Sequence, residues 1–514
     1  MTRNNPGGSS VLVSMSDAPV DDPPALGWHR ELVALYERRY DHLVRLAYLL
    51  TGRAAEAEEI VQDASSPPGG RGRACGVTPA ATMVVTAATP GRTHVSETNV
   101  GGPATDWTEV AREVADGLVA DALTRDRDAK PPTAEVEALR RAELLALMVP
   151  ADLGGGGQSW PVVHRVIRVI GAADASIGQL LAAHYVQLWR LGLFAPPATS
   201  ERLEMATARH RWFWAGAGEP LAAPVTLTPA GDGFLADGRT WSALGPSVAD
   251  RLVVDAVRTD TGAEVTFTIG WRAPGIRFHD DELRTGLRLV AGGGVEFAHV
   301  PVAPGEVVGE RPLWGSPEEP RWSLEPLASQ LARAQLAVAT AEGALAAAAA
   351  CVREVGELAP APAPASPAAA LPAGEAPVER DGPASEHAAS PPLPDPALLA
   401  THGELVAQVA AAGTLLDQAV EALAAADSRG LGLTAEERGG ASVAVARAAL
   451  VAGRTAVEVT GRAAEVAGPR ATAARHGFDR YWRDARALTL RSEATAAARI
   501  VGAHSLTGLV PTHG

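Results

Sequence analysis

The hydrophobic positions in the first half of the chain follow a helical period in two regions. In residues 28–64, apolar side chains such as Leu32 and Leu35 recur at the spacing of one helix face. Residues 106–210 repeat this pattern, and one of the predicted helices covers residues 133–148. We expect amphipathic helices in both regions, each burying one face.

Residues 211–310 have a different pattern. Apolar and polar positions alternate there, or short apolar runs lie between Gly-Asp-Gly, Asp-Gly and Thr-Gly turns. Such turns are typical of connections between antiparallel strands. The pattern predicts a small antiparallel β-domain between two helical blocks.

Helical periodicity returns after this domain. A long alanine- and leucine-rich helix is predicted over residues 327–357. Asp395 and Pro396 form a good N-cap and first turn for the next helix, and Thr434 with Glu437 is the pattern of a capping box. Four helices in this block suggest a bundle, so the expected fold class is α+β and mostly α.

Proline-, glycine- and alanine-rich stretches separate these blocks. Residues 359–394 contain Pro-Ala repeats, which favour an extended, mobile loop. The expected organisation is a disordered segment over 1–27, a helical fragment over 28–64, a linker over 65–105, a helical domain over 106–210, a β-domain over 211–310, and a helical bundle over 324–510 with an insert at 359–394.

The composition of the chain argues against some classes of function. The formal net charge of −15 argues against a general nucleic-acid binder. Two cysteines, Cys75 and Cys351, provide neither a disulfide framework nor a metal cluster, so the cytoplasm is the expected compartment. We find no apolar run of the length that spans a membrane and no signal-peptide core.

A polar turn joins the last predicted helices. It contains Arg470, Arg475 and His476, and the next helix opens near Asp479. Backbone amides at a helix start, with guanidinium groups beside them, could hold a phosphate or pyrophosphate. A solvated, arginine-rich connection between helices is an equally good interpretation.

The run HGFDRYWRDARALTL, at residues 476–490, resembles the C-terminal signature of flavin enzymes with the acyl-CoA dehydrogenase fold. Within that superfamily it is most similar to flavin-dependent monooxygenases of the dibenzothiophene monooxygenase type. The "VP…GG" turn at Pro150 and the helix start at Trp160 also match, and the resemblance covers about residues 106–510. It implies a helical domain, a middle β-domain and a four-helix bundle that assembles into a homotetramer.

The resemblance also implies a flavin, FMN or FAD, between the β-domain and the bundle. Small residues in segments 212–220 and 238–250 would let backbone amides approach the ring, although ordinary tight turns are the alternative. Arg288 matches an arginine that, in this family, reaches the flavin phosphate. The alternative interpretation is that Arg288 is an ordinary surface arginine. The cofactor-binding residues expected are Trp214, Ala215, Gly216, Ala217, Ser242, Gly245, Arg288 and Arg470.

The acid–base groups of the family are substituted in this sequence. The family alignment places Ser492 where the dehydrogenases carry a glutamate, with Glu493 the next residue. Leu488 and Arg491 take the places of two histidines in the monooxygenases. Ala217 replaces an asparagine in those enzymes, which need hydrogen-bond donors near the flavin.

Three residues are therefore candidates for catalysis: His184, Glu493 and His476. His184 lies on an apolar helix where the monooxygenase branch has a pocket histidine, although a core or interface histidine is the alternative. Leu244 replaces a serine of that branch, so different chemistry or lost activity is also compatible with the sequence.

Residues 28–64 resemble the opening of region 2 of extracytoplasmic-function sigma factors. The DNA-reading half of that region does not follow, since the sequence turns into a low-complexity stretch after Ala64. A fragment of this size builds little core alone. We interpret it as a vestigial or accidental fusion.

By resemblance, the chain is expected to be a flavin-dependent oxidoreductase. It would take reduced flavin from a separate reductase and use O₂ on a small hydrophobic or sulfur-containing substrate. One alternative is a true acyl-CoA dehydrogenase. Another is a catalytically degenerate scaffold or a polymerase-binding protein. Neither a membrane nor a nucleic-acid partner is expected.

Overall fold

The computed structural model describes residues 105–279, 284–312, 315–358, 395–490 and 493–511. The chain divides into two units, Met1–Thr86 and Ala87–Gly514, and every described residue belongs to the second unit. The predictions for residues 1–104, including the sigma-like fragment, lie outside the described residues, as does the prediction for the 359–394 insert.

The second unit begins with a helical block. Its α-helices are α3 (Trp107–Asp128), α4 (Thr133–Arg141), α5 (Trp160–Ala173), α6 (Ala175–Phe194) and α7 (Pro197–His210). Asp106 caps α3, since its Oδ1 accepts the N–H groups of Thr108 and Glu109. The hydrophobic core of the unit extends from this block into the other two.

The helix expected over residues 133–148 is shorter than predicted. α4 ends at Arg141 because Glu143 adopts a left-handed conformation, with φ at 61°. The chain then forms two 3₁₀ turns, η1 (Leu144–Ala146) and η2 (Ala151–Leu153). Carbonyl groups of this stretch become available to side chains from α6.

The middle block is a sheet, built from β1 (Trp214–Gly216), β2 (Glu219–Pro220), β3 (Val225–Ala230), β4 (Gly233–Ala243), β5 (Arg251–Arg258), β6 (Glu264–Gly270), β7 (Ile276–His279), β8 (Gly293–Val302) and β9 (Val307–Glu310). The order is β7-β8-β4-β3-β5-β6-β9, with β1 beside β5 and β2 beside β4. The sheet is not purely antiparallel as expected, because β5 pairs in parallel with both β1 and β3.

The last block contains α8 (Glu319–Trp322), α9 (Glu325–Leu358), α10 (Pro396–Ser428), α11 (Ala435–Ala467), α12 (Phe478–Thr489) and α13 (Glu493–Thr507), with η4 (Gly430–Gly432) and η5 (Pro469–Thr472) between helices. Both predicted caps are confirmed. Asp395 accepts the N–H of Ala397 at 2.9 Å. Thr434 and Glu437 exchange the reciprocal hydrogen bonds of a capping box.

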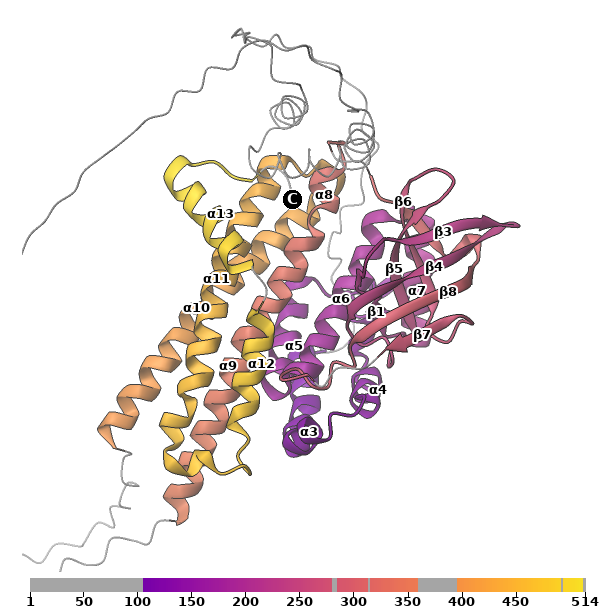
Figure 1. Cartoon of the computed structure of the whole chain (residues 1–514). Coiled ribbons are helices and arrows are strands. Elements are labelled where there is room, and N and C mark those ends of the chain that lie inside the picture. The colour runs from indigo at the N-terminus through magenta and orange to yellow at the C-terminus, as the bar shows by residue number, and fades with distance from the viewer. Residues whose placement is uncertain (1–104, 280–283, 313–314, 359–394, 491–492, 512–514) are drawn as a thin grey trace, which may run out of the picture. The chain divides into compact units, whose positions relative to one another are not determined.

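α6 lies between the sheet and the bundle. In Figure 1, α9, α10 and α11 run side by side, and α5 and α6 separate them from the strands. α6 packs on α9 on one side and on β1 on the other. The expected mostly helical α+β fold is confirmed.

Three helical stretches are long and apolar enough to cross a membrane by length and composition alone: Glu319–Glu354, Pro396–Ser428 and Ala435–Ala467. The sequence analysis missed them because scattered charges interrupt their apolar runs. Their hydropathy comes largely from alanine, and α9, α10 and α11 pack against one another. We attribute the apolar composition to this close packing.

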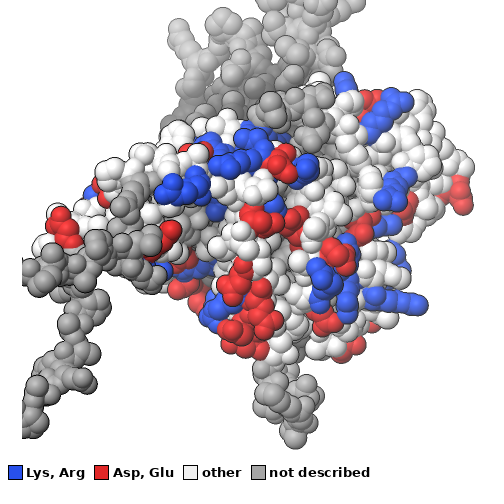
Figure 2. Space-filling view, turned by 90° about the horizontal axis from the view of Figure 1, so that it is seen from below, with Lys and Arg blue, Asp and Glu red and all other residues white. Residues whose placement is uncertain are grey.

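Charged residues of both signs alternate on the face shown in Figure 2. Ion pairs such as Arg112–Glu109 on α3 and Arg140–Glu137 on α4 join neighbouring positions along the helices. This mixed pattern differs from the one-signed surface typical of nucleic-acid binding.

Glycine at position 343 should be required for the contact between α9 and α5. A Cβ there would lie 2.2 Å from the carbonyl oxygen of Ala172. We predict that Gly343→Ala lowers the free energy of unfolding by about 1–3 kcal/mol, measured by urea denaturation. Gly440→Ala is the matched control, because nothing lies within 4 Å of its added methyl group. It should stabilise the protein by about 0.5–1 kcal/mol, and equal effects of the two changes would contradict the packing argument.

Candidate functional site

One face of α6 supports the segments expected to form the flavin site. Ser176, Leu180, His184 and Gln187 are spaced by four, four and three residues, so they lie on the same face of the helix. This face extends for about 16 Å along the helix axis.

Each of these four side chains meets a different point of the β-domain. The hydroxyl of Ser176 accepts the N–H of Leu289 at 3.3 Å, and a Cβ at Gly245 would lie 2.8 Å from Leu180. His184 accepts the N–H of Trp214. Gln187 lies against Gly216, because a Cβ added to Gly216 would be 2.8 Å from Nε2 of Gln187. The helix therefore aligns two of the predicted segments with the stretch around Arg288.

His184 is fully buried, and both ring nitrogens have backbone partners. Its Nδ1 accepts the N–H of Trp214 at 3.0 Å, so Nε2 carries the hydrogen that is donated to the carbonyl of Leu145 at 2.7 Å. Burial lowers the pKa of His184 to about 4, so the imidazole is neutral at physiological pH. Neither nitrogen is left for a substrate. The geometry makes His184 a residue that positions β1 and gives no support to the expected catalytic role.

The two small-residue segments lie next to each other, as a shared cofactor wall requires. Glu219 of β2 pairs with Trp241 of β4, and the hydroxyl of Thr240 donates to the carbonyl of Ala217. Gly218 has a φ of 87°, and a Cβ there would lie 2.2 Å from the carbonyl oxygen of Trp241. Only glycine permits so close a crossing of the two segments.

Several groups in these segments are already used for packing. The amide of Ala217 donates to Val253, and that of Gly245 donates to Val290. These two amides are thus unavailable to a flavin, contrary to the expectation. The indole of Trp214 is fully buried and points toward α7, where Nε1 donates to Thr207 at 2.9 Å. Small side chains here let α6 approach the sheet closely.

Arg288 belongs to a segment that α12 holds against the sheet. The guanidinium of Arg483 donates to the carbonyl of Thr285 at 2.8 Å, and Asp484 accepts the N–H of Leu287 at 2.6 Å. A Cβ at Gly286 would lie 2.2 Å from the carbonyl oxygen of Arg483. The half-buried side chain of Arg288 reaches the end of α3, at 3.5 Å from the carbonyl of Arg127.

The other predicted residues are distributed along the last helices. His476 precedes α12 and has a buried Nε2 with no hydrogen-bond partner among the described residues. Glu493 begins α13, beyond the other end of α12, so about 18 Å of helix separates the two. They cannot act at one reacting atom in this arrangement. Glu493, Arg470 in η5 and Ser242 in β4 are described by their backbone positions alone.

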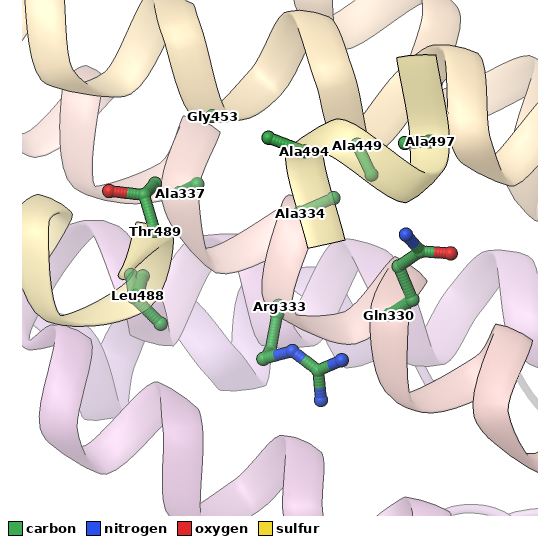
Figure 3. Close-up of a pocket in the computed structure, with 10 residues that line it drawn as sticks. All are labelled: Gln330, Arg333, Ala334, Ala337, Ala449, Gly453, Leu488, Thr489, Ala494 and Ala497. Carbon is green, nitrogen blue, oxygen red and sulfur yellow. The ribbon is translucent and has the colours of Figure 1, made fainter. Parts of the chain in front are cut away.

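A cavity of about 50 Å³ lies among four helices of the last block (Figure 3). Its lining is Gln330, Arg333, Ala334 and Ala337 of α9, Ala449 and Gly453 of α11, Leu488 and Thr489 of α12, and Ala494 and Ala497 of α13. The wall is mostly methyl groups, with a carboxamide, a guanidinium and a hydroxyl among them. Leu488 is the residue that the family alignment places at a histidine position, so the cavity adjoins the expected reaction centre.

Several residues around the candidate site were not predicted from the sequence. Ser176, Gln187 and Asp484 bind or cover backbone groups of the β-domain, and Arg284 packs its guanidinium against Gly292. The four-residue spacing of Ser176 and His184 around Leu180 was visible in the sequence. The contacts of Asp484 and Arg284 depend on chain crossings that periodicity does not reveal.

Comparison with known proteins identifies the family of the chain. A family model described as the acyl-CoA dehydrogenase C-terminal domain matches residues 386–493. Dibenzothiophene monooxygenase of Rhodococcus qingshengii is 30% identical over 421 residues, which cover 80% of this chain and 95% of the relative. A Pseudomonas putida protein, "Probable FMNH2-dependent monooxygenase SfnC", is 30% identical over 383 residues, 74% of this chain and 90% of the relative.

A solved structure extends the match to three dimensions. The crystal structure of FMN-bound TdsC from Paenibacillus sp. A11-2 has a TM-score of 0.67 and 31% identity, covering 80% of this chain and 99% of that chain. The chain belongs to the acyl-CoA dehydrogenase superfamily, in the branch of flavin-dependent monooxygenases related to dibenzothiophene monooxygenase. It is a flavin-dependent oxidoreductase.

Replacing His184 should reveal its structural role. We predict that His184→Ala lowers the free energy of unfolding by about 2–4 kcal/mol, because the buried Leu145 carbonyl and Trp214 amide both lose their partner. The control is the exposed His210, whose ring stacks on Trp212, and His210→Ala should change stability by about 1 kcal/mol or less. Urea denaturation of both variants is the measurement. Wild-type stability of His184→Ala would show that its two hydrogen bonds are dispensable.

Proposed function

We propose that this chain is the oxygenating component of a two-component flavin monooxygenase. It takes reduced FMN from a separate flavin reductase and uses O₂ to oxygenate a small hydrophobic or sulfur-containing molecule. Reduced FMN supplies the two electrons, with one oxygen atom passing to the substrate and the other to water. The observation that carries the proposal is the alignment of both small-residue segments and the Arg288 segment on one face of α6.

Two buried polar atoms support a cofactor at this place. The Oγ of Ser247 and the Nε of Arg284 have no hydrogen-bond partner among the described residues. They lie on the two segments that the Gly245–Val290 hydrogen bond joins. Buried polar groups are seldom left unsatisfied, so a polar ligand here is the simplest explanation. Arg288, with Arg284 beside the turn, would hold the phosphate, and the small residues from Trp214 to Gly245 would border the ring.

The cavity beside Leu488 is the proposed substrate side of the site. At about 50 Å³ it is well below the roughly 150 Å³ of an engineered cavity that binds benzene, so this state admits only part of an aromatic substrate. Ala494 and Ala497 of α13 form one wall. Gln330 and Arg333 provide hydrogen-bond donors there, and we propose that they replace the two histidines that this chain lacks.

The assembly is proposed from the resemblance. A homotetramer would form through the bundle and would cover the exposed side chains of Leu399 and Val406 on α10, which are each 43% exposed. The cytoplasm is the proposed location, where a reductase and NADH are both present.

Activity distinguishes the two enzyme classes. With NADH and a flavin reductase, we expect the chain to convert dibenzothiophene or indole to a product that carries one oxygen atom from ¹⁸O₂. We expect no reduction of an acceptor dye by acyl-CoA. Mass spectrometry of the product and dye absorbance are the measurements. Dye reduction without oxygen incorporation would make the chain a dehydrogenase.

Arg288 should contribute to FMN affinity. We predict that Arg288→Ala raises the Kd for FMN about 10- to 100-fold, the usual effect of losing a charged hydrogen bond to phosphate. Flavin fluorescence quenching measures this. Arg277→Ala is the control, because Arg277 is an exposed arginine of β7 that pairs with Glu296. An unchanged Kd for Arg288→Ala would remove Arg288 from the site.

Filling the cavity should affect the substrate without affecting FMN. We predict that Ala334→Leu raises the KM for indole about tenfold or more, because a buried isobutyl group occupies the space, while the Kd for FMN stays within about twofold. Ala346→Leu, on the exposed side of the same helix, is the control. An Ala334→Leu variant with wild-type KM would place the substrate elsewhere.

A further inference from the structure

Asp484 is a buried carboxylate that contacts the β-domain across a domain boundary. Its side chain is 3% exposed, and its Oδ1 accepts the backbone N–H of Leu287 at 2.6 Å. Leu287 has a φ of 52°, a left-handed conformation that is uncommon for leucine. An outside contact is needed to keep such a residue in place, and Asp484 provides it.

The residues that follow Leu287 form the inner edge of the proposed flavin site. Two positions later, Leu289 donates to Ser176 of α6, and the carbonyl of Val290 accepts the amide of Gly245 at 2.8 Å. Arg288 lies between these anchors. A shift at Leu287 would therefore move both the guanidinium of Arg288 and the Gly245 turn.

We propose that Asp484 is a positioning residue for cofactor binding: its carboxylate oxygen fixes the 285–290 segment on α12 and thereby places Arg288 and the Gly245 turn. This inference rests on the proposed function, because it assumes that Arg288 and Gly245 border FMN. Asp484 itself has no contact with the reacting atoms. Asp484 links the 285–290 segment to α12, and α12 also carries Leu488 at the cavity.

The charges around Asp484 are nearly balanced. Arg480 of α12 favours the ionised form of Asp484, whereas Asp174 of the α5–α6 turn and Asp126 of α3 disfavour it. Both of these aspartates have arginine partners of their own, Arg125 with Asp174 at 2.9 Å and Arg483 with Asp126 at 2.6 Å. Thus three buried aspartates and three arginines meet where α3, α6 and α12 reach the β-domain.

Burial is the largest influence on this carboxyl group, and it raises the pKa of Asp484 to about 7. Because the folded-state pKa lies above the unfolded value, this group stabilises the fold at low pH. That contribution is lost as pH rises through about 7. The thermal midpoint of the FMN-free protein should therefore fall more steeply between about pH 4 and 7 in the wild type than in Asp484→Asn.

Two substitutions at Asp484 distinguish the effect of its hydrogen-bond acceptor from the effect of its side-chain shape. Asp484→Asn keeps an oxygen that can accept from Leu287, whereas Asp484→Leu keeps the branched shape in a bulkier side chain and removes the acceptor. The control is Asp232→Asn, which makes the same change of charge in the exposed turn between β3 and β4. The measurements are the Kd for FMN and the amide exchange of residues 285–290 in the FMN-free protein.

We expect Asp484→Leu to raise the Kd for FMN about tenfold, the effect of losing one buried hydrogen bond, and to speed amide exchange in residues 285–290. Asp484→Asn and Asp232→Asn should stay within about threefold of the wild type. Equal losses in the Asn and Leu variants, or wild-type behaviour of Asp484→Leu, would overturn the proposal.

Two further outcomes are informative. If Asp484→Leu does not fold, Ser176→Ala removes the second anchor of the same segment, and it must weaken FMN binding and speed the same exchange for the proposal to hold. If the wild type binds no FMN, the proposed function fails. Amide exchange of the FMN-free Asp484 variants still tests whether Asp484 holds the segment.

Discussion

The hydrogen bonds that fix residues 285–290 between α6 and α12 decide how the β-domain meets the helices. Leu287 and Leu289 are buried, so their amides must find partners inside the protein. The sheet does not provide them, and side chains from two helices, Asp484 and Ser176, do so. The same contacts bring Arg288 and the Gly245 turn together. The contacts that pack the domains together are thus the same ones on which the proposed cofactor site depends.

Small residues serve this arrangement in two ways. A Cβ at Gly216 would lie 2.8 Å from the side chain of Gln187, and one at Gly245 would lie 2.8 Å from that of Leu180, so these α6 side chains would have to move. In the sequence these glycines appeared to provide a flat wall for a flavin. The structure shows that they first permit the sheet to approach α6, and the cofactor proposal then relies on the position that this approach creates.

Local features of the fold could be predicted well from the sequence. The order of helical, strand-rich and helical blocks followed from periodicity, and the caps at Asp395 and Thr434 from short patterns. The long-range features could not be predicted. The carbonyl that His184 binds lies 39 residues away, on a turn created by the early end of α4, and the amide that Asp484 binds lies 197 residues away. The resemblance to the monooxygenases suggested where a flavin would lie, and these contacts show which of the expected residues are engaged in packing.

The cavity wall carries Leu488, at a position where the resemblance led us to expect a histidine. Placement of the cofactor remains the central claim. Hydrogen–deuterium exchange with and without FMN tests it most directly. The account predicts slower exchange on FMN addition in three segments, residues 214–217, 243–248 and 285–290, with the exposed helix α7 unchanged. Bound FMN that protects none of these segments, or that protects only the α10 face of the bundle, would contradict it.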